Sequence, residues 1–453
     1  MIDSDANRQF DSMVIGLGLT GLSCARYLAS RGERIAIADS RAQPPQLAAL
    51  QDMLPDVPLY LGDLAAAPLQ RAGRLIVSPG LSLQDPAIAA AVAGGVPALG
   101  DIELFAQAQA VRTRPVPVVA VTGANGKSTV TTLVAAMAQA ARRRPAAGGN
   151  LAPPALDLLD EPMVDLYVLE LSSFQLETTR SLNASAAVVL NISADHMDRY
   201  AGLDDYAAAK ARIYAGDGVM VINRDDPLVA AMQDPARTSL AFTLADPGDD
   251  DSVFGLRDGW LVRGSRRLLP VAEVSLKGQH NLANALAALA LGTATGLPML
   301  AMLETLRNYA GLPHRCQWIA RRCGADWYDD SKGTNVGASV AAIEGLAGSN
   351  DTILIAGGDG KGADFSALAA AARGRVRVAV VLGRDAERIA AVLENDIPVV
   401  RATDMPAAVA AAAEQAHTDD KVLLSPACAS LDMFRDYKQR GEVFAACVRE
   451  LDA

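Results

Sequence analysis

Residues 118–129, Val-Val-Ala-Val-Thr-Gly-Ala-Asn-Gly-Lys-Ser-Thr, decide the fold class of this 453-residue chain. The apolar run 118–121 predicts a short buried strand, and the glycines at 123 and 126 predict a tight loop directly after it. A helix is expected from Lys127 onward. A strand that enters a helix through a short glycine loop is the start of an α/β unit.

The loop between this strand and this helix predicts a phosphate-binding site. Backbone N–H groups in such a loop surround phosphate oxygens, while a lysine ammonium reaches the terminal phosphates and a hydroxyl binds Mg²⁺. The usual loop has a further glycine five residues before its second glycine, where this chain has Val121. We therefore predict a shortened nucleotide-binding loop, with Lys127 at the phosphates and Ser128 at a magnesium ion.

A second glycine motif, Gly16-Leu-Gly-Leu-Thr-Gly21, lies in and after the strand-like stretch 13–18. Such glycines let the backbone approach a pyrophosphate at a helix N-terminus, and an acid about 20 residues further on can bind a ribose hydroxyl. Asp39 ends the next strand-like run and fits that acid. Three interpretations stay open at this point: a nicotinamide dinucleotide site, another nucleotide diphosphate site, and a tight turn without a ligand.

Strand-like and helix-like patterns alternate along the whole chain, which predicts the α/β class with parallel, doubly wound sheets. At roughly 150 residues per domain, the length suggests three domains. We place them at 1–100, 101–311 and 312–453, and we interpret residues 106–117, which lack periodicity, as a linker. A content of 51% hydrophobic and only 4% aromatic residues indicates cores built from alanine and leucine.

The composition also excludes several classes of protein. Five cysteines without a Cys-x-x-Cys pair exclude a disulfide framework and a zinc site, and they indicate a reducing, cytoplasmic location. The sequence contains no run that predicts a membrane span or a signal peptide, and the net charge of −11 argues against nucleic acids and anionic membranes as partners. Only seven of the 41 basic residues are lysines, so each lysine is a candidate for a task that arginine cannot perform.

Further polar residues follow predicted strands, where open α/β sheets collect their ligands. Glu170 ends a buried strand-like run and is a candidate magnesium ligand. His196 follows another such run, with Lys210 close behind it. Asn281 and Asn284 are three residues apart on one predicted helix, where they fit either a purine or ribose site or a helix cap.

Eight motifs occur in order along the chain and together resemble those of the Mur ligases. The likeness is greatest to the members of that family that add D-glutamate to UDP-N-acetylmuramoyl-L-alanine. It implies an N-terminal Rossmann-like UDP-binding domain, a central P-loop ATPase-type domain and a C-terminal Rossmann-like glutamate-binding domain. The motifs span residues 122–129 (TGANGKST), 169–176 (LELSSFQL), 191–200 (NISADHMDRY), 278–281 (GQHN), 312–315 (LPHR), 329–335 (DDSKGTN), 357–361 (GGDGK) and 424–432 (LSPACASLD).

The resemblance implies an ATP-dependent amide ligase of peptidoglycan precursor synthesis. ATP would phosphorylate the carboxylate of UDP-N-acetylmuramoyl-L-alanine, and the amine of D-glutamate would attack the acyl phosphate, releasing phosphate in addition to ADP. Because this reaction gathers negative charge, it needs fixed cations and metal ions where the charge develops. The implied partners are these three small molecules, without nucleic acid or membrane, and the implied state is a monomer.

The resemblance also assigns residues to sites. ATP would be bound by Gly123, Asn125, Gly126, Lys127, Ser128, Thr129, Asn281, Asn284, Arg315 and Asp330. The UDP substrate would be bound by Gly18, Leu19, Thr20, Asp39, Ser40, Arg41, Gly80, Asn150, Ser172 and His196. Glutamate would be bound by Lys332, Thr334, Lys361, Ser430 and Tyr437. Two magnesium ions would be held by Ser128, Glu170, His196 and Lys210, and the catalytic residues would be Lys127, Glu170, His196 and Lys210.

Lys210 matches a lysine that is carbamylated in this family. An uncharged lysine that captures carbon dioxide becomes a carboxylate and can bind a metal ion, which arginine cannot do. The chain departs from the usual motifs at Ala124, Gly333 and Tyr437, and the last of these lies in the implied glutamate site.

Four alternatives remain. A related ligase would add L-glutamate, and the sequence does not decide the stereochemistry. A folylpolyglutamate synthase-like ligase shares the shortened loop but begins with its P-loop domain. A nicotinamide-dependent oxidoreductase leaves the phosphate loop unexplained, and a noncatalytic nucleotide-binding regulator leaves the metal and lysine positions unexplained.

Overall fold

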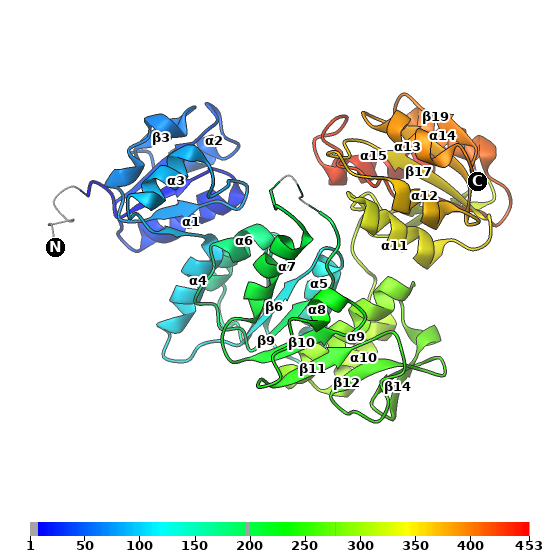
Figure 1. The fold of residues 1–453 in the computed structure, drawn as a ribbon, viewed down its shortest axis with the longest axis horizontal. Coiled ribbons are helices and arrows are strands. Elements are labelled where there is room, and N and C mark those ends of the chain that lie inside the picture. Colours follow the sequence, from blue (N-terminus) through cyan, green and yellow to red (C-terminus); the bar gives the residue numbers. More distant parts are fainter. Residues whose placement is uncertain (1–7, 196, 198, 277, 453) are drawn as a thin grey trace. The chain divides into compact units, whose positions relative to one another are not determined.

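The structure is a computed structural model that describes residues 8–195, 197, 199–276 and 278–452. Its contacts divide the chain into two compact units. The first unit comprises Met1–Ile192, His196–Pro270 and Asn284–Thr305, and the second comprises Ser193–Asp195, Val271–Ala283 and Leu306–Ala453. Within the described residues the strands form three sheets, two in the first unit and one in the second, so the predicted α/β class is confirmed (Figure 1).

The first sheet is parallel, with the order β3-β2-β1-β4-β5. Every residue of β1 and β2 is buried, which explains why both strands are near-continuous apolar runs. Because β1 lies between β2 and β4, the winding reverses there, and the carboxyl ends of these strands flank the place where open α/β sheets bind ligands. The elements are β1 Ser12–Ile15, α1 Leu19–Ser30, β2 Ile35–Asp39, α2 Leu47–Met53, β3 Leu59–Leu61, β4 Leu75–Val77, α3 Pro86–Ala93 and β5 Ala98–Leu99.

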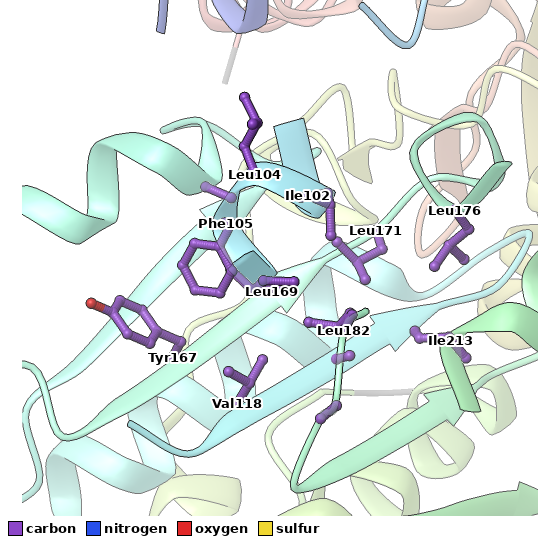
Figure 2. Packing of buried hydrophobic residues seen from close by; sticks show 14 of the residues in the cluster. Ile102, Leu104, Phe105, Val118, Tyr167, Leu169, Leu171, Leu176, Leu182 and Ile213 are labelled. Carbon is purple, nitrogen blue, oxygen red and sulfur yellow. The ribbon is translucent and has the colours of Figure 1, made fainter. Parts of the chain in front are cut away.

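The interpretation of residues 106–117 as a linker is partly wrong, because α4 Asp101–Ala110 covers its first part. The apolar residues of α4 repeat at helical spacing from Ile102, which lies before the stretch interpreted as a linker. Phe105 of this helix packs edge-on against Tyr167, with 5.1 Å between the ring centroids, inside an apolar cluster that also contains Leu169 (Figure 2). Only residues 111–117 connect the helix to the next strand, through a turn and bends followed by an irregular stretch.

The second sheet has the order β14-β13-β12-β11-β10-β9-β6-β8-β7 and is parallel from β7 to β12. Strand β6 lies between β8 and β9, so the segments that leave the carboxyl ends of these three strands are neighbours. The elements up to β11 are β6 Val118–Thr122, α5 Lys127–Ala140, β7 Pro145–Gly149, β8 Leu166–Glu170, α6 Ser173–Glu177, β9 Ala186–Val189, α7 Leu203–Ala211, β10 Val219–Asn223, α8 Pro227–Ala230 and β11 Ser239–Phe242.

Two antiparallel pairings, β12–β13 and β13–β14, extend this sheet, and the sequence analysis did not predict them. The turn signal was present, because Asp258-Gly259 joins β12 to β13 with positive φ at both residues. Among the described helices, none is long and apolar enough to cross a membrane. The remaining elements are β12 Val253–Arg257, β13 Trp260–Arg263, β14 Arg266–Pro270, α9 Gln279–Ala294 and α10 Met299–Asn308.

The sheet of the second unit has the order β15-β16-β20-β17-β18-β19, and β15 is antiparallel to β16. Residues of α11, α12 and α13 pack in one apolar cluster with this sheet, and residues of α14 and α15 pack in another. The elements are β15 Gln317–Arg322, β16 Ala325–Asp329, α11 Val336–Leu346, β17 Thr352–Gly357, α12 Ser366–Ala372, β18 Val376–Leu382, α13 Ala386–Leu393, β19 Val399–Arg401, α14 Met405–Gln415, β20 Lys421–Leu424 and α15 Tyr437–Glu450.

Candidate active site

The phosphate loop runs from the end of β6 to the start of α5, as the sequence predicts. Gly123 has a φ of +151° and Gly126 a φ of +84°, values that favour glycine. A Cβ atom on Gly126 would lie 2.4 Å from Oδ1 of Asn284, and one on Gly123 would lie 2.9 Å from Cβ of Leu190. The loop is therefore packed tightly, and Asn284 of α9 lies against it.

Two of the seven lysines meet at this loop. Lys127 Nζ donates to the carbonyl oxygens of Gly123 and Ala124, each at 2.9 Å. Lys210 Nζ donates to the same Gly123 oxygen at 2.9 Å, and the Lys210 residue is only 1% exposed. Its ammonium also lies 4.5 Å from the ring centroid of Tyr206. The predicted catalytic lysines are thus neighbours, and one carbonyl oxygen accepts from both.

Glu170 ends β8 beside this loop and has a carboxylate oxygen with unusual surroundings. Its Oε1 accepts a hydrogen bond from Asn150 Nδ2 at 2.6 Å, whereas its buried Oε2 has no hydrogen-bond partner within the described residues. A buried charged oxygen without a partner is costly, and a cation would satisfy it. Ser128, in the first turn of α5, is 6% exposed. An oxygen donor set of this kind suits Mg²⁺.

The other predicted metal ligands are less defined. His196 lies outside the described residues, as do Asp198 and Lys277. The described residues contain no group of three His, Cys, Asp or Glu side chains that could hold a metal ion by themselves. Within the described part of the chain, further magnesium ligands beside Glu170 would therefore be hydroxyl groups, a modified side chain or the bound nucleotide.

Ser172 has a structural role in the described residues. It is the N-cap of α6 and forms a capping box, because its Oγ accepts from the Gln175 N–H and the Gln175 side chain accepts from the Ser172 N–H. Gln175 Nε2 in turn donates to Oδ2 of Asp101 at 2.9 Å. Burial raises the pKa of Asp101 to about 6, although the hydrogen bond from Gln175 opposes that rise.

The N-terminal glycine loop is held from inside by Asp39. The Leu17 N–H donates to Oδ2 of Asp39 at 2.7 Å, and the guanidinium of Arg41 donates to both carboxylate oxygens at 2.9 and 2.7 Å. Burial would raise the pKa of Asp39, but the hydrogen bonds from Arg41 and Leu17 outweigh it and lower the pKa. Asp39 was expected to contact the nucleotide directly, and in this structure its two oxygens serve protein donors.

The remaining residues predicted for the UDP substrate in this region lie at the carboxyl edge of the first sheet. Gly18 is the N-cap of α1, and Leu19 and Thr20 form its first turn. Gly21 makes the turn possible, because a Cβ there would lie 1.9 Å from the Gly16 oxygen. Ser40 and Gly80 follow β2 and β4. The strand order thus brings together loops that are distant in sequence.

In the second unit, Asp330 directly follows β16 and is buried. Its Oδ2 accepts from Ser425 Oγ at 2.7 Å, and its Oδ1 accepts from the Cys316 N–H at 3.2 Å. Burial raises the pKa of Asp330 to about 7, against the lowering effect of Ser425 and of the positive charge of Arg315. This carboxyl therefore takes up and loses its proton near neutral pH.

The predicted glutamate residues come from three loops of the second unit. Lys332 Nζ lies 4.0 Å from the ring centroid of Tyr437, at the start of α15. Backbone hydrogen bonds in both directions between Asp359 and Ala429, at 3.0 and 2.8 Å, pair the loop of Lys361 with the loop of Ser430. Thr334 lies two residues after Lys332, and its N–H donates to the Lys332 oxygen at 2.8 Å.

The sequence analysis missed Arg440, which is only 2% exposed. Its guanidinium donates to the Ser331 hydroxyl at 3.0 Å, to the Ser331 oxygen at 2.8 Å and to the Cys428 oxygen at 3.1 Å. Burial lowers its pKa to about 10. Arg440 thereby fixes the loops after β16 and β20 to α15. An arginine in a helix with a polar sequence resembles a surface residue, so its pattern gave no signal.

Three models of known protein families match the chain, in segments that correspond to the three sheets. The description "Mur ligase MurD-like, N-terminal domain" matches residues 11–100, "Mur ligase middle domain" matches residues 121–292, and "Mur ligase, glutamate ligase domain" matches residues 314–428. Together these models match most of the chain. The chain therefore belongs to the Mur ligase family.

Relatives within the family are similar over almost the whole chain. A protein of Nitrosococcus oceani named UDP-N-acetylmuramoylalanine–D-glutamate ligase is 56% identical, with 97% of this chain and 96% of that protein covered. A protein of Pseudomonas aeruginosa with the same name is 52% identical, covering 97% and 98%. The solved UDP-N-acetylmuramate-alanine ligase of Thermotoga maritima has a TM-score of 0.61 at 18% identity, covering 97% and 99%, and this likeness concerns the fold alone.

Proposed function

We propose that this protein is an ATP-dependent ligase that joins D-glutamate to UDP-N-acetylmuramoyl-L-alanine. The name shared by relatives that are more than half identical over nearly the full chain supports this activity rather than L-glutamate or folate chemistry. The observation that carries the proposal in the structure is the cluster at the carboxyl edge of the second sheet, where Lys127, Lys210 and the unpartnered Glu170 oxygen surround the phosphate loop.

Each domain binds one substrate. Residues 1–100 bind the UDP part, residues 101–311 bind ATP, and residues 312–453 bind glutamate. In the first reaction step, a carboxylate oxygen of the alanine attacks the γ-phosphorus of ATP and ADP leaves, which gives an acyl phosphate. In the second step, the glutamate amine attacks the acyl carbon, and phosphate leaves from the tetrahedral intermediate as the amide forms and the amine loses a proton.

The side chains of this site have separate tasks in that reaction. The Lys127 ammonium exchanges its contacts with the loop carbonyls for the phosphate oxygens and stabilises the charge that develops on the transferred group. The first-turn N–H groups of α5 face the same phosphates. Arg315, Asp330, Asn281 and Asn284 hold the nucleoside of ATP. Lys332 and Lys361 neutralise the two carboxylates of glutamate. Thr334, Ser430 and Tyr437 complete the glutamate site.

The residues at the phosphate loop fit magnesium. Glu170 and Ser128 would hold one ion, because Oε2 of Glu170 has no hydrogen-bond partner among the described residues and Ser128 lies in the first turn of α5. His196 and a carbamylated Lys210 would hold a second magnesium ion. The reaction of the neutral Lys210 amine with carbon dioxide forms the carbamate and releases one proton. Bound magnesium ions would neutralise negative charge on the phosphates.

The protein acts as a monomer in the cytoplasm, in the stage of cell wall synthesis that supports cell shape and division. Its partners are small molecules, and it binds neither nucleic acid nor membrane. The UDP part contacts Gly18, Leu19, Thr20, Ser40, Arg41 and Gly80, with Asp39 holding their loops in place. Asn150, Ser172 and His196 bind the muramoyl group.

The test is ADP release by the purified protein with ATP, Mg²⁺, UDP-N-acetylmuramoyl-L-alanine and each glutamate enantiomer. We expect release that requires both the UDP substrate and D-glutamate, and that is lost in Lys127→Ala. Lys421→Ala is the matched control, because Lys421 starts β20 and pairs with Asp351 at 2.6 Å, away from the phosphate loop in sequence and sheet. Release that is independent of both substrates, or that requires L-glutamate instead, would refute the proposal.

A further inference from the structure

Asn191, two residues after the end of β9, makes three hydrogen bonds to the phosphate loop. Its backbone oxygen accepts the Ala124 N–H at 2.9 Å, and its side-chain Oδ1 accepts the Asn125 N–H at 2.8 Å. Its side-chain Nδ2 donates to the Asn125 oxygen at 3.2 Å. Asn191 thus holds both backbone groups of Asn125 with one amide.

The segment that carries Asn191 is itself fixed from the side away from the loop. The Leu190 oxygen accepts from Asn223 Nδ2 at 2.8 Å, and the Ile192 N–H donates to Asp226 Oδ2 at 2.7 Å. Asn223 ends β10 and is only 8% exposed. The residues before and after Asn191 are therefore hydrogen-bonded to a neighbouring strand and its following turn, which limits how far the Asn191 amide can move.

The shape of the loop explains why such a brace is needed. Only the four residues Gly123–Gly126 connect β6 to α5, and both glycines have positive φ. Because glycine loses more conformational freedom on folding than other residues, a short loop with two glycines needs outside contacts to keep one conformation. The two N–H groups of Ala124 and Asn125 are both used by Asn191, so these donors serve the shape of the loop.

We propose that Asn191 is the positioning residue of the phosphate loop, which holds it in the conformation that binds the nucleotide. This inference rests on the proposed binding of ATP at the loop. Asn191 acts through Asn125 and does not touch the nucleotide. It fixes the direction of the peptide groups that lead into the first turn of α5, where the N–H groups of a helix have no partner within the helix and can face phosphates.

The experiment compares ADP binding by Asn191→Ala and Asn191→Asp with binding by the unmodified protein, using calorimetry in the presence of Mg²⁺. Alanine removes both side-chain hydrogen bonds, and we expect ADP to bind about tenfold more weakly. Aspartate has the same size, but it replaces the donor to the Asn125 oxygen with a carboxylate near the phosphates, so we expect a loss at least as large. The KM for ATP rises in parallel, whereas the KM values for the other two substrates stay unchanged.

Asn183 provides the matched control at the opposite end of β9. Its amide also makes two hydrogen bonds, one from Nδ2 to Asp217 Oδ1 at 2.9 Å and one from the Asp217 N–H to its Oδ1 at 3.2 Å. We expect Asn183→Ala to lower the melting temperature and to leave ADP affinity unchanged. A role for Asn191 in stability alone would move the melting temperature of its variants and not their ADP affinity, which would overturn the proposal.

The outcomes separate this inference from the proposed function. If the unmodified protein binds ADP and forms no amide, the ligase activity is refuted, while the binding comparison still decides the role of Asn191. If both Asn191 variants bind ADP as tightly as the unmodified protein, the positioning role is refuted and the ligase proposal stands. If the unmodified protein does not bind ADP, both are refuted.

Discussion

Oε2 of Glu170, which has no hydrogen-bond partner among the described residues, predicts that Glu170→Gln changes the stability of the protein in opposite directions with and without bound metal. Glu170 is 3% exposed, and of its two carboxylate oxygens only Oε1 has a hydrogen-bond partner in the described part of the chain. Glutamine keeps an oxygen that accepts from Asn150 and removes the buried charge. We therefore expect the metal-free variant to be more stable than the unmodified protein, and the metal-bound variant to be less stable.

The magnitude follows from these contacts. A buried polar group without a partner costs about 1–3 kcal/mol, more when it is charged. The glutamine amide replaces the charge with a neutral donor that still lacks a partner, so the gain in the free energy of unfolding is about 1 kcal/mol, or roughly 2–4 °C for a domain of this size. With Mg²⁺ and ADP at about 100 times the dissociation constant, the unmodified protein gains about 2.7 kcal/mol, and the variant loses most of that.

The assay is thermal unfolding of both proteins, first with EDTA and then with Mg²⁺ and ADP. Glu103→Gln is the control, because Glu103 is also buried but accepts from the N–H groups of Arg180 and Ser181 and from the Ser181 hydroxyl. We expect that control to be less stable under both conditions. If Glu170→Gln also lowers the melting temperature in EDTA, Oε2 of Glu170 has a partner in the unmodified protein. If Mg²⁺ and ADP stabilise the variant as much as the unmodified protein, Glu170 is not a metal ligand.

Three further predictions concern buried charges. Lys210→Ala should be nearly inactive and should be partly restored by small carboxylates, and full activity without them would exclude the carbamate. The pKa of Asp101 is raised from 3.8 to about 6, so the folded state holds this proton more tightly than the unfolded state and loses stability as the pH rises from about 4 to about 6. Asp101→Asn should flatten that part of the plot of melting temperature against pH. An unchanged slope would contradict the raised pKa of Asp101. Arg440→Lys cannot reach the oxygens of both Ser331 and Cys428 with its single ammonium, so the free energy of unfolding should fall by about 2–3 kcal/mol, measured by denaturant titration, whereas an unchanged midpoint would show that these hydrogen bonds contribute little.

Much of the fold was predictable because its signals are local. The strands at 118–122, 166–170 and 352–357 are short apolar runs whose buried faces demand such residues. The hairpins after residue 253 were not predicted, although their turns carry glycines, because their strands are short and arginines at 257, 263, 266 and 267 interrupt the apolar pattern. The predicted linker at residues 106–117 wrongly included the second half of helix α4, because the apolar pattern of the helix continues into that stretch.

The candidate site was predictable in a different way. Lys127 and Glu170 could be found because they lie at or just beyond the carboxyl ends of strands, and the parallel order of those strands brings them together. The loop-holding contacts that Asp39 makes with the Leu17 N–H and Asn191 makes with Asn125 could not be found, because their partners are backbone groups that any residue type supplies. Arg440 stayed hidden because nothing in its neighbouring sequence tells a buried arginine from a solvated one.

The contacts of Lys127 bear on how binding measurements at this loop are interpreted. Its ammonium is hydrogen-bonded to the carbonyl oxygens of Gly123 and Ala124, so a phosphate that binds it competes with these two acceptors. The measured affinity then reports the difference between phosphate and carbonyl as acceptors. A substitution of Lys127 removes both sides of that competition, and the loss of affinity in the variant will be smaller than the attraction between the ammonium and the phosphate itself.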